Sequence, residues 1–169
     1  MSLGPDRDDM EYRLPKTTMF DGDILHYADS LQIPDFTGVK MRDELPLNPG
    51  FKECGILNLE PHTEEGSHWV AWLKDGDQRY YFDSFGEPPP LELESYLKTD
   101  EELKTDQPAI RRSAITVQHD ASKECGSLCL YVLCRLSRGE PFAFILKDLQ
   151  ERYLKTNTPP LVIKPQAHY

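Results

Sequence analysis

The stretch that decides the fold is residues 67–86, SHWVAWLKDGDQRYYFDSFG. Two runs rich in aromatic and aliphatic residues, 68–73 and 79–85, flank a polar segment that contains a glycine. Runs of this kind around a glycine-containing turn predict a β-hairpin. Counting back from the turn pairs the start of the first strand with the end of the second, so we expect His68 and Asp83 to meet.

Periodicity and turn residues predict further elements on both sides of this hairpin. We expect helices over 21–32, 90–97 and 126–136 and another from Pro141, strands over 54–59 and 114–118, and irregular connections over 34–50 and 99–107. The helix over 126–136 is strongly apolar, which predicts that it is buried. The expected fold class is α+β, with a small, mostly antiparallel sheet packed against helices.

Composition and charge restrict the partners that the chain can have. At 169 residues, of which 38% are hydrophobic, it is long enough for one well-buried core. A formal net charge of −10 argues against a nucleic-acid-binding surface, which needs clustered Lys and Arg. Since no apolar run approaches the roughly 18 residues of a membrane-spanning helix, we expect no membrane partner.

Cysteine usage indicates a reducing environment. The chain has four cysteines, and its first residues lack the basic and apolar segments of a secretory signal. We therefore expect free thiols in an intracellular compartment, such as the cytoplasm or nucleus of a host cell. No Cys-x-x-Cys pair is present, so we expect neither a metal site nor another cofactor. Cys54, Cys129 and Cys134 are interpreted as core residues.

Cys125 is the candidate nucleophile. It starts the apolar helix, where unpaired backbone N–H groups and the positive end of the helix dipole favour a thiolate. Gly126 is expected to leave room for a substrate to approach the sulfur. Glu124 precedes the cysteine, and an acid there opposes thiolate formation unless it points to solvent. A lone cysteine is more often a small core residue, so that interpretation stays open.

His68 is the candidate base, and Asp83 is the candidate group that orients it. A carboxylate beside an imidazole fixes its tautomer and stabilises the imidazolium, as in a catalytic triad. Trp69 would give His68 a rigid aromatic neighbour. The alternatives are a core histidine bonded to a carbonyl group and an aspartate that caps the turn before Ser84.

Gln118 ends the strand expected over 114–118. Its side-chain amide can donate to a developing oxyanion, beside the backbone N–H of Cys125. An ordinary polar residue at a strand end is an equally good interpretation of Gln118. His119 comes next and is expected to line the same site.

Taken in order, these residues resemble one family of enzymes. The segments that carry the resemblance are Gly66-Ser67-His68-Trp69, Tyr81-Phe82-Asp83-Ser84-Phe85-Gly86, Gln118 and Cys125-Gly126-Ser127-Leu128-Cys129. They are similar to the adenovirus-type cysteine proteases (adenain), whose superfamily includes the SUMO proteases. The likeness extends over roughly 21–150 and is greatest to adenain-like proteases of large DNA viruses and of Polinton/Maverick-type elements.

The resemblance implies a role for each residue of this order. Cys125 would be the nucleophile, His68 the base, Asp83 the orienting group and Gln118 a donor in the oxyanion hole. Trp69 would pack beside the reacting pair, and it would contact the substrate together with Gly126 and His119. The substrate would be a protein or peptide that is cut at a Gly-rich, Gly-Gly-like site through a thioester.

The sequence shows no internal repeat or long linker and so predicts one domain with a segment at each end. We expect an N-terminal extension over 1–20, a protease domain over 21–155 and a C-terminal tail over 156–169 that lies on the surface. We expect a monomer. Adenovirus proteases are stimulated by DNA, but the net charge of −10 argues against a DNA cofactor for this chain.

Three functions fit these expectations. The first is an endopeptidase that matures capsid precursors of a virus or mobile element and is packaged in the virion. The second is an isopeptidase that removes ubiquitin or a ubiquitin-like protein, because that chemistry also cuts after Gly-Gly. The third is a non-catalytic partner-binding module on a protease fold.

Overall fold

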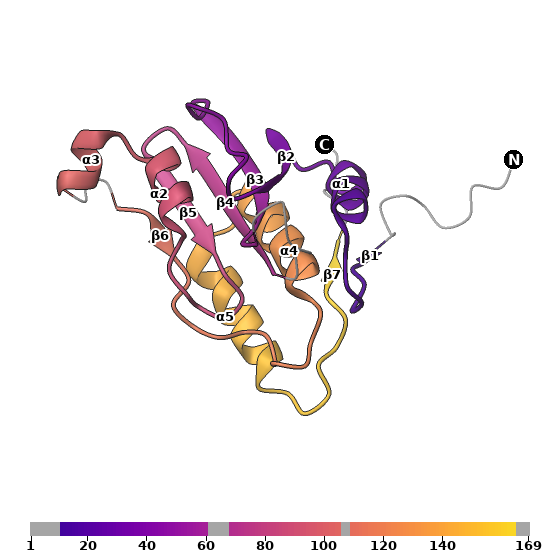
Figure 1. The fold of residues 1–169 in the computed structure, drawn as a ribbon. Helices are drawn as coiled ribbons and strands as arrows, with labels where there is room; N and C mark the ends of the chain where they lie inside the picture. Colours follow the sequence, from indigo (N-terminus) through magenta and orange to yellow (C-terminus); the bar gives the residue numbers. More distant parts are fainter. Residues whose placement is uncertain (1–10, 61–67, 106–108, 165–169) are drawn as a thin grey trace, which may run out of the picture.

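The computed structural model describes residues 11–60, 68–105 and 109–164. A mixed β-sheet forms its centre, with strands in the order β2-β3-β4-β5-β6 (Figure 1). These strands are β2 (Phe36–Met41), β3 (Lys52–Asn58), β4 (Trp69–Asp75), β5 (Gln78–Phe82) and β6 (Arg111–Arg112). The central strands β3, β4 and β5 pair antiparallel, whereas β2 and β6 pair in parallel with their neighbours at the edges. The predicted α+β class is confirmed.

Strands β4 and β5 form the predicted hairpin. Asp75 pairs with Gln78 across a tight turn, where Gly76 has a φ of +60°, in the left-handed region that favours glycine. His68 lies directly before β4, and Asp83 lies directly after β5. The hairpin therefore places both residues at the same end of the sheet.

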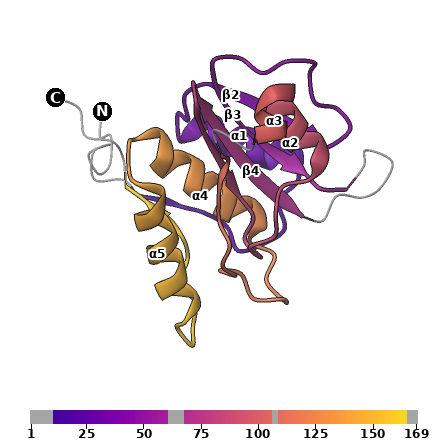
Figure 2. The same cartoon turned by 90° about the vertical axis from the view of Figure 1, so that its left-hand side faces the viewer.

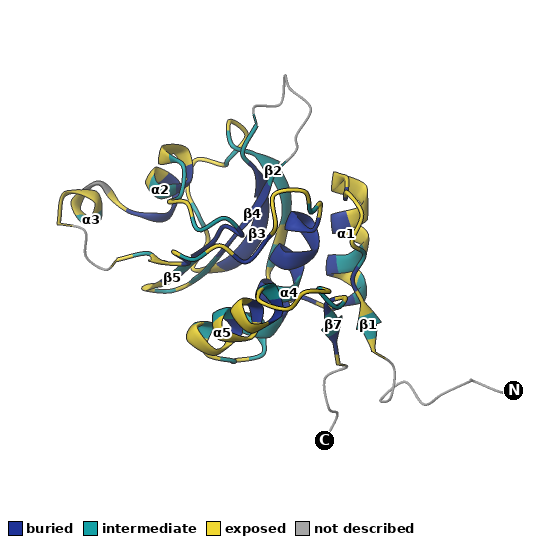
Figure 3. Cartoon of the chain, turned by 90° about the horizontal axis from the view of Figure 1, so that it is seen from below, coloured by how far each residue is buried: buried dark blue, intermediate teal, exposed yellow. Residues whose placement is uncertain are grey.

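Helices cover both faces of the sheet. α4 (Cys125–Ser137) packs on β4, and both α1 (Asp21–Ser30) and α5 (Phe142–Tyr153) contact α4. Figure 2 shows α4 lying between the sheet and α5. α2 (Leu91–Leu97) covers the opposite face and is followed by α3 (Asp100–Thr105) (Figure 3).

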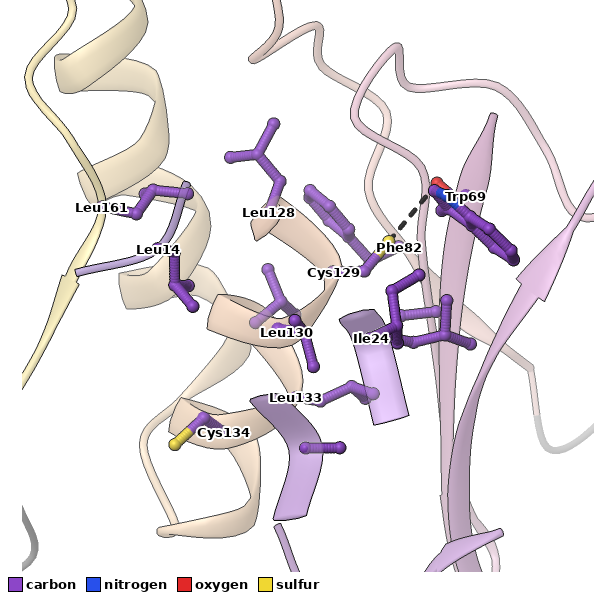
Figure 4. Close-up of a cluster of buried hydrophobic side chains, with 14 of the residues drawn as sticks. Leu14, Ile24, Trp69, Phe82, Leu128, Cys129, Leu130, Leu133, Cys134 and Leu161 are labelled. Carbon is purple, nitrogen blue, oxygen red and sulfur yellow. Dashed lines mark hydrogen bonds between the residues drawn. The ribbon is translucent and has the colours of Figure 1, made fainter. Parts of the chain in front are cut away.

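Alternate side chains of the strands point to opposite faces and so build two apolar layers. The layer toward α4 contains Ile56, Ala71, Phe82, Leu128, Leu130 and Leu133 (Figure 4). The layer toward α2 contains Leu57, Val70, Trp72, Tyr81, Leu93 and Leu97. With both faces of β4 buried, this strand is a rigid base for the residues at its end.

The segments on either side of the expected protease domain pack together. β1 (Tyr12–Arg13) pairs antiparallel with β7 (Val162–Ile163), and the N–H of Leu14 donates to the carbonyl of Leu161 at 2.9 Å. Leu14 and Leu161 are both buried in the core around α4, on the side of this helix that faces away from the sheet (Figure 4). Contrary to our expectation of a surface tail, residues 161–163 contribute to the core. Residues 1–10 and 165–169 of the expected extension and tail lie outside the described residues.

Three predicted elements differ from the observed ones. β2 lies in a segment expected to be irregular; its pairing with β3 shifts at Gly38, which has a φ of +118°. α3 lies in the connection expected over 99–107, of which 106–108 are outside the described residues. Residues 114–118, all of which are described, form no strand, and the edge strand is β6 instead. Over the described ranges no helix has both the length and the apolar character needed to cross a membrane.

Candidate active site

The end of the β4–β5 hairpin holds an imidazole and a carboxylate in contact. His68 Nε2 lies 2.8 Å from Asp83 Oδ1. Asp83 is 1% exposed, and the same oxygen accepts a hydrogen bond of 2.9 Å from the N–H of Phe85. The Phe85 ring stacks on the His68 ring with centroids 5.1 Å apart. These contacts fix the orientation of the imidazole from two sides.

The Asp83 backbone is anchored to the next segment of chain. Its N–H donates to Ser113 Oγ, and the Ser113 hydroxyl donates to the Asp83 carbonyl, both at 3.1 Å. Ser113 follows the edge strand β6, so the parallel pairing of β6 with β5 delivers it to this position. These two hydrogen bonds thus fix the backbone that carries the Asp83 carboxylate.

Cys125 begins α4 and forms a hydrogen bond with His68. Because Nε2 of His68 is occupied by Asp83, the ring presents Nδ1 to the thiol. Burial on its own lowers the pKa of His68, but the hydrogen bonds and charges of Asp83 and Cys125 outweigh it, and this pKa is raised to about 9. The arrangement therefore favours an imidazolium at neutral pH.

Gln118 is held by hydrogen bonds at both ends of its amide. Oε1 accepts from the Ser84 hydroxyl at 2.5 Å, and Nε2 donates to the Ser122 carbonyl at 2.8 Å. A carbonyl can only accept, so this pairing assigns Nε2 to the side of Ser122. An amide nitrogen carries two hydrogens, and one of them remains beyond the bond to Ser122.

One cavity of about 730 Å³ joins these groups. Four of the predicted site residues line it: His68, Trp69, Gln118 and Cys125. The rest of the lining is Thr18, Met19, Phe20, Phe85, Asp120, Ser122 and Lys123. The Trp69 indole N–H donates to the Met19 carbonyl at 3.0 Å, so the segment before α1 forms one wall. Cys125 is 6% exposed and sits in this lining.

Two predicted substrate contacts lie differently from expectation. A Cβ at Gly126 would be 3.2 Å from Met19 and 3.4 Å from Trp69, so the space beside this glycine is filled by the protein. His119 stacks on Tyr153 with centroids 4.3 Å apart and lines a neighbouring cavity of about 720 Å³. The structure thus does not bring His119 to the cavity of Cys125.

Glu124, the acid before Cys125, does not point to solvent. Its Oε2 lies 2.5 Å from Nη2 of Arg152, and both side chains are buried. The Arg152 charge therefore offsets the acid next to Cys125.

The other cysteines have different surroundings. Cys54, Cys129 and Cys134 are free and buried. Burial raises the pKa of each of these thiols, that of Cys54 to about 12. Cys129 Sγ donates to the Trp69 carbonyl at 3.3 Å, which ties α4 to β4 below the cavity (Figure 4). Among the described residues, no group of three or more His, Cys, Asp and Glu side chains could hold a metal ion.

Several residues of the site were not singled out from the sequence. Ser84 and Phe85 follow Asp83 directly, so their place in the quoted motif was the available signal. Ser113 and Met19 come from distant segments and carry no local signal. Only the tertiary structure shows that they belong to the site.

The fold that carries this site is that of a protease of known structure. The chain is similar to the crystal structure of the ASFV pS273R protease with a TM-score of 0.52 and 17% sequence identity, over 89% of this chain and 69% of that one. The SUMO protease Ulp1, solved with its catalytic cysteine oxidized to a sulfinic acid, gives a TM-score of 0.48 and 15% identity, over 82% and 75% of the two chains. No family model and no curated protein matches the chain.

Proposed function

We propose that the protein is a cysteine protease in which Cys125, His68 and Asp83 form the catalytic triad. The observation that carries this proposal is the chain of contacts from Cys125 at the start of α4 to His68 and from His68 to Asp83 at 2.8 Å. A thiol, an imidazole and a buried carboxylate in this order are the parts that nucleophilic catalysis needs. The protease fold supports the same interpretation.

The first half of the reaction is attack on the scissile carbonyl. The Cys125 thiolate, paired with the His68 imidazolium, adds to the carbonyl carbon, whose oxygen becomes an oxyanion. The backbone N–H of Cys125 and the amide of Gln118 would bind this oxyanion, since both residues line the same cavity. The C–N bond then breaks as His68 protonates the leaving amine, which leaves a thioester on Cys125.

The second half of the reaction hydrolyses the thioester and regenerates the free enzyme. His68, now neutral, takes a proton from water, and the resulting hydroxide equivalent adds to the thioester carbon. The C–S bond breaks and the carboxylic acid leaves, while Cys125 returns as the thiolate beside a protonated His68. Asp83 holds the imidazole through both halves.

We propose a Gly-rich, Gly-Gly-like cleavage site for this reaction. Aromatic side chains of Trp69, Phe85 and Phe20 line the cavity beside Cys125. Bulky walls of this kind support a substrate with small residues near the cut. The adenain-like motif order in the sequence supports capsid precursors of a virus or mobile element as the natural substrates.

Peptide reporters test the proposal. Wild type is expected to hydrolyse a Gly-Gly reporter and Cys125→Ala to have no activity, while Cys134→Ala, which removes a core thiol, keeps activity. Equal hydrolysis by wild type and Cys125→Ala would refute the triad. Ubiquitin and SUMO vinyl sulfone probes run in parallel separate an isopeptidase from an endopeptidase, because only an isopeptidase is expected to react with them.

A further inference from the structure

A buried ion pair lies directly next to the proposed nucleophile. Glu124, the residue before Cys125, is 6% exposed, and Arg152 from α5 is 8% exposed. Glu124 Oε2 and Arg152 Nη2 are 2.5 Å apart, and Arg152 Nε donates to the Pro159 carbonyl at 2.9 Å. Arg152 is thereby fixed between the last helix and the segment after it.

The pair continues into the proposed oxyanion site. Glu124 Oε1 accepts from the Ser122 hydroxyl at 3.3 Å, and the Glu124 N–H donates back to the same hydroxyl at 3.2 Å. The Ser122 carbonyl accepts from Gln118 Nε2, and Ser84 holds the other end of that amide. A continuous set of hydrogen bonds therefore joins Arg152 to Gln118.

Stability alone does not account for this ion pair. Removing two charges from water is unfavourable, and a protein with well-packed apolar residues in place of a buried pair is often equally stable or more stable. The pair does, however, fix one geometry, because the Arg152 guanidinium binds Glu124 and the Pro159 carbonyl at the same time. The geometry that it fixes is that of residues 118–124, which end at Cys125.

We propose that Glu124 and Arg152 are positioning residues, which hold the Gln118 amide and the backbone N–H of Cys125 where an oxyanion would form. This inference rests on the proposed protease function and adds residues that do not touch the substrate. Ser122 links the ion pair to the amide of Gln118, and Ser84 holds the other end of that amide independently of the pair. A displacement of these donors by about 1 Å costs on the order of 100-fold in rate.

The test compares Arg152→Gln with a matched control at another contact between α4 and α5. Arg135 of α4 lies 2.7 Å from Asp148 of α5, so Arg135→Gln breaks an ion pair between the same two helices without touching residues 118–124. For Arg152→Gln we expect kcat to fall about 10- to 100-fold with KM nearly unchanged. Arg135→Gln is expected to keep both values.

Two further readouts separate positioning from a general structural effect. Alkylation of Cys125 by iodoacetamide needs the thiolate but no oxyanion donor, so its rate is expected to stay at the wild-type level in Arg152→Gln. Hydrogen exchange of the Gln118 side-chain amide, followed by NMR, is expected to become faster. Arg152→Lys, which keeps the charge, is expected to recover part of kcat.

Folding failure is addressed by the paired variant Glu124→Gln/Arg152→Gln, which leaves no unpaired buried charge. We expect it to fold and to show the same loss of kcat and the same faster Gln118 exchange. Unchanged Gln118 exchange in both variants would overturn the inference. If wild type hydrolyses no reporter, the protease proposal fails, and the exchange measurement still decides whether Arg152 holds Gln118.

Discussion

Two opposing effects act on the pKa of the His68 imidazole. Burial disfavours its charge, whereas the hydrogen bonds and charges of Asp83 and Cys125 favour it. The second influence is the larger, because two partners contact one ring and Asp83 is itself shielded from water. Burial without either partner would lower the pKa of His68 and favour the neutral imidazole.

The pH dependence of activity follows from this balance. His68 must be protonated to donate to the leaving amine, so kcat/KM is expected to fall as pH rises through about 9. In Asp83→Asn the charge that raises the pKa is gone, and the alkaline limb is expected to move down by about one pH unit or more. Profiles of kcat/KM against pH for both proteins check this; an alkaline limb at the same pH in both would contradict it.

Protonation of His68 also makes the free energy of unfolding depend on pH. The pKa of His68 lies above the 6.5 of a free imidazole, so its contribution to folding is complete below pH 6.5 and is lost as pH rises through about 9. The difference in unfolding free energy between wild type and His68→Gln is therefore expected to shrink over that window. Urea denaturation at pH 6 and pH 9.5 measures it.

At the scale of elements, the packing of β3 beside β4 requires a glycine at position 55. Gly55 is the register partner of Trp72, and a Cβ at Gly55 would lie 2.4 Å from the Trp72 ring. Trp72 is fully buried against α2 and cannot move aside. Gly55→Ala is expected to lower the unfolding free energy by about 1–3 kcal/mol. Urea unfolding followed by tryptophan fluorescence measures this loss.

Gly22 supplies the control for that substitution. It lies in α1, and a Cβ there would meet no described atom within 4 Å. Gly22→Ala is expected to be neutral or to stabilise the protein by up to about 1 kcal/mol. Equal effects of the two substitutions would show that the Trp72 contact does not limit residue 55.

Local sequence predicted the elements that carry a clear apolar pattern. The β4–β5 hairpin and α4 carry long apolar runs bounded by Gly76 and by Gly139, so their type and place follow from pattern. β2 did not, because it is a half-buried edge strand interrupted at Gly38. β6 has two exposed arginines and exists through parallel pairing with β5, a contact that no local pattern encodes.

The residues of the site also divide into those that local sequence predicts and those that it does not. The hairpin brings His68 and Asp83 to the same end of the sheet, where the two side chains make contact at 2.8 Å. Gln118 was expected at the end of a strand and instead follows an irregular segment, in which the Val117 N–H donates to the Ser84 carbonyl at 2.8 Å. Gly86 permits this close approach, because a Cβ there would lie 2.9 Å from the Ile115 backbone.

At the scale of the whole molecule, the β1–β7 pair closes the structure. Leu161, 2% exposed, packs in the core around α4, whereas Leu154 is 75% exposed. Leu161→Ala is expected to lower the unfolding free energy by about 2–5 kcal/mol. Leu154→Ala is expected to change it by less than about 0.5 kcal/mol. Thermal and urea unfolding of the two variants compare them; equal stability would mean that the packing of Leu161 does not stabilise the fold.

The β1–β7 pair also makes the chain suited to circular permutation. Tyr12 is the register partner of Ile163, so a hairpin loop of about two to five residues can join the end of β7 to the start of β1. New termini opened at the exposed Asp77, in the turn after β4, would then put Asp83 near the start of the chain and His68 near its end. In such a permutant the two residues would meet only through the folded sheet, so their covalent proximity could be removed while their contact is kept.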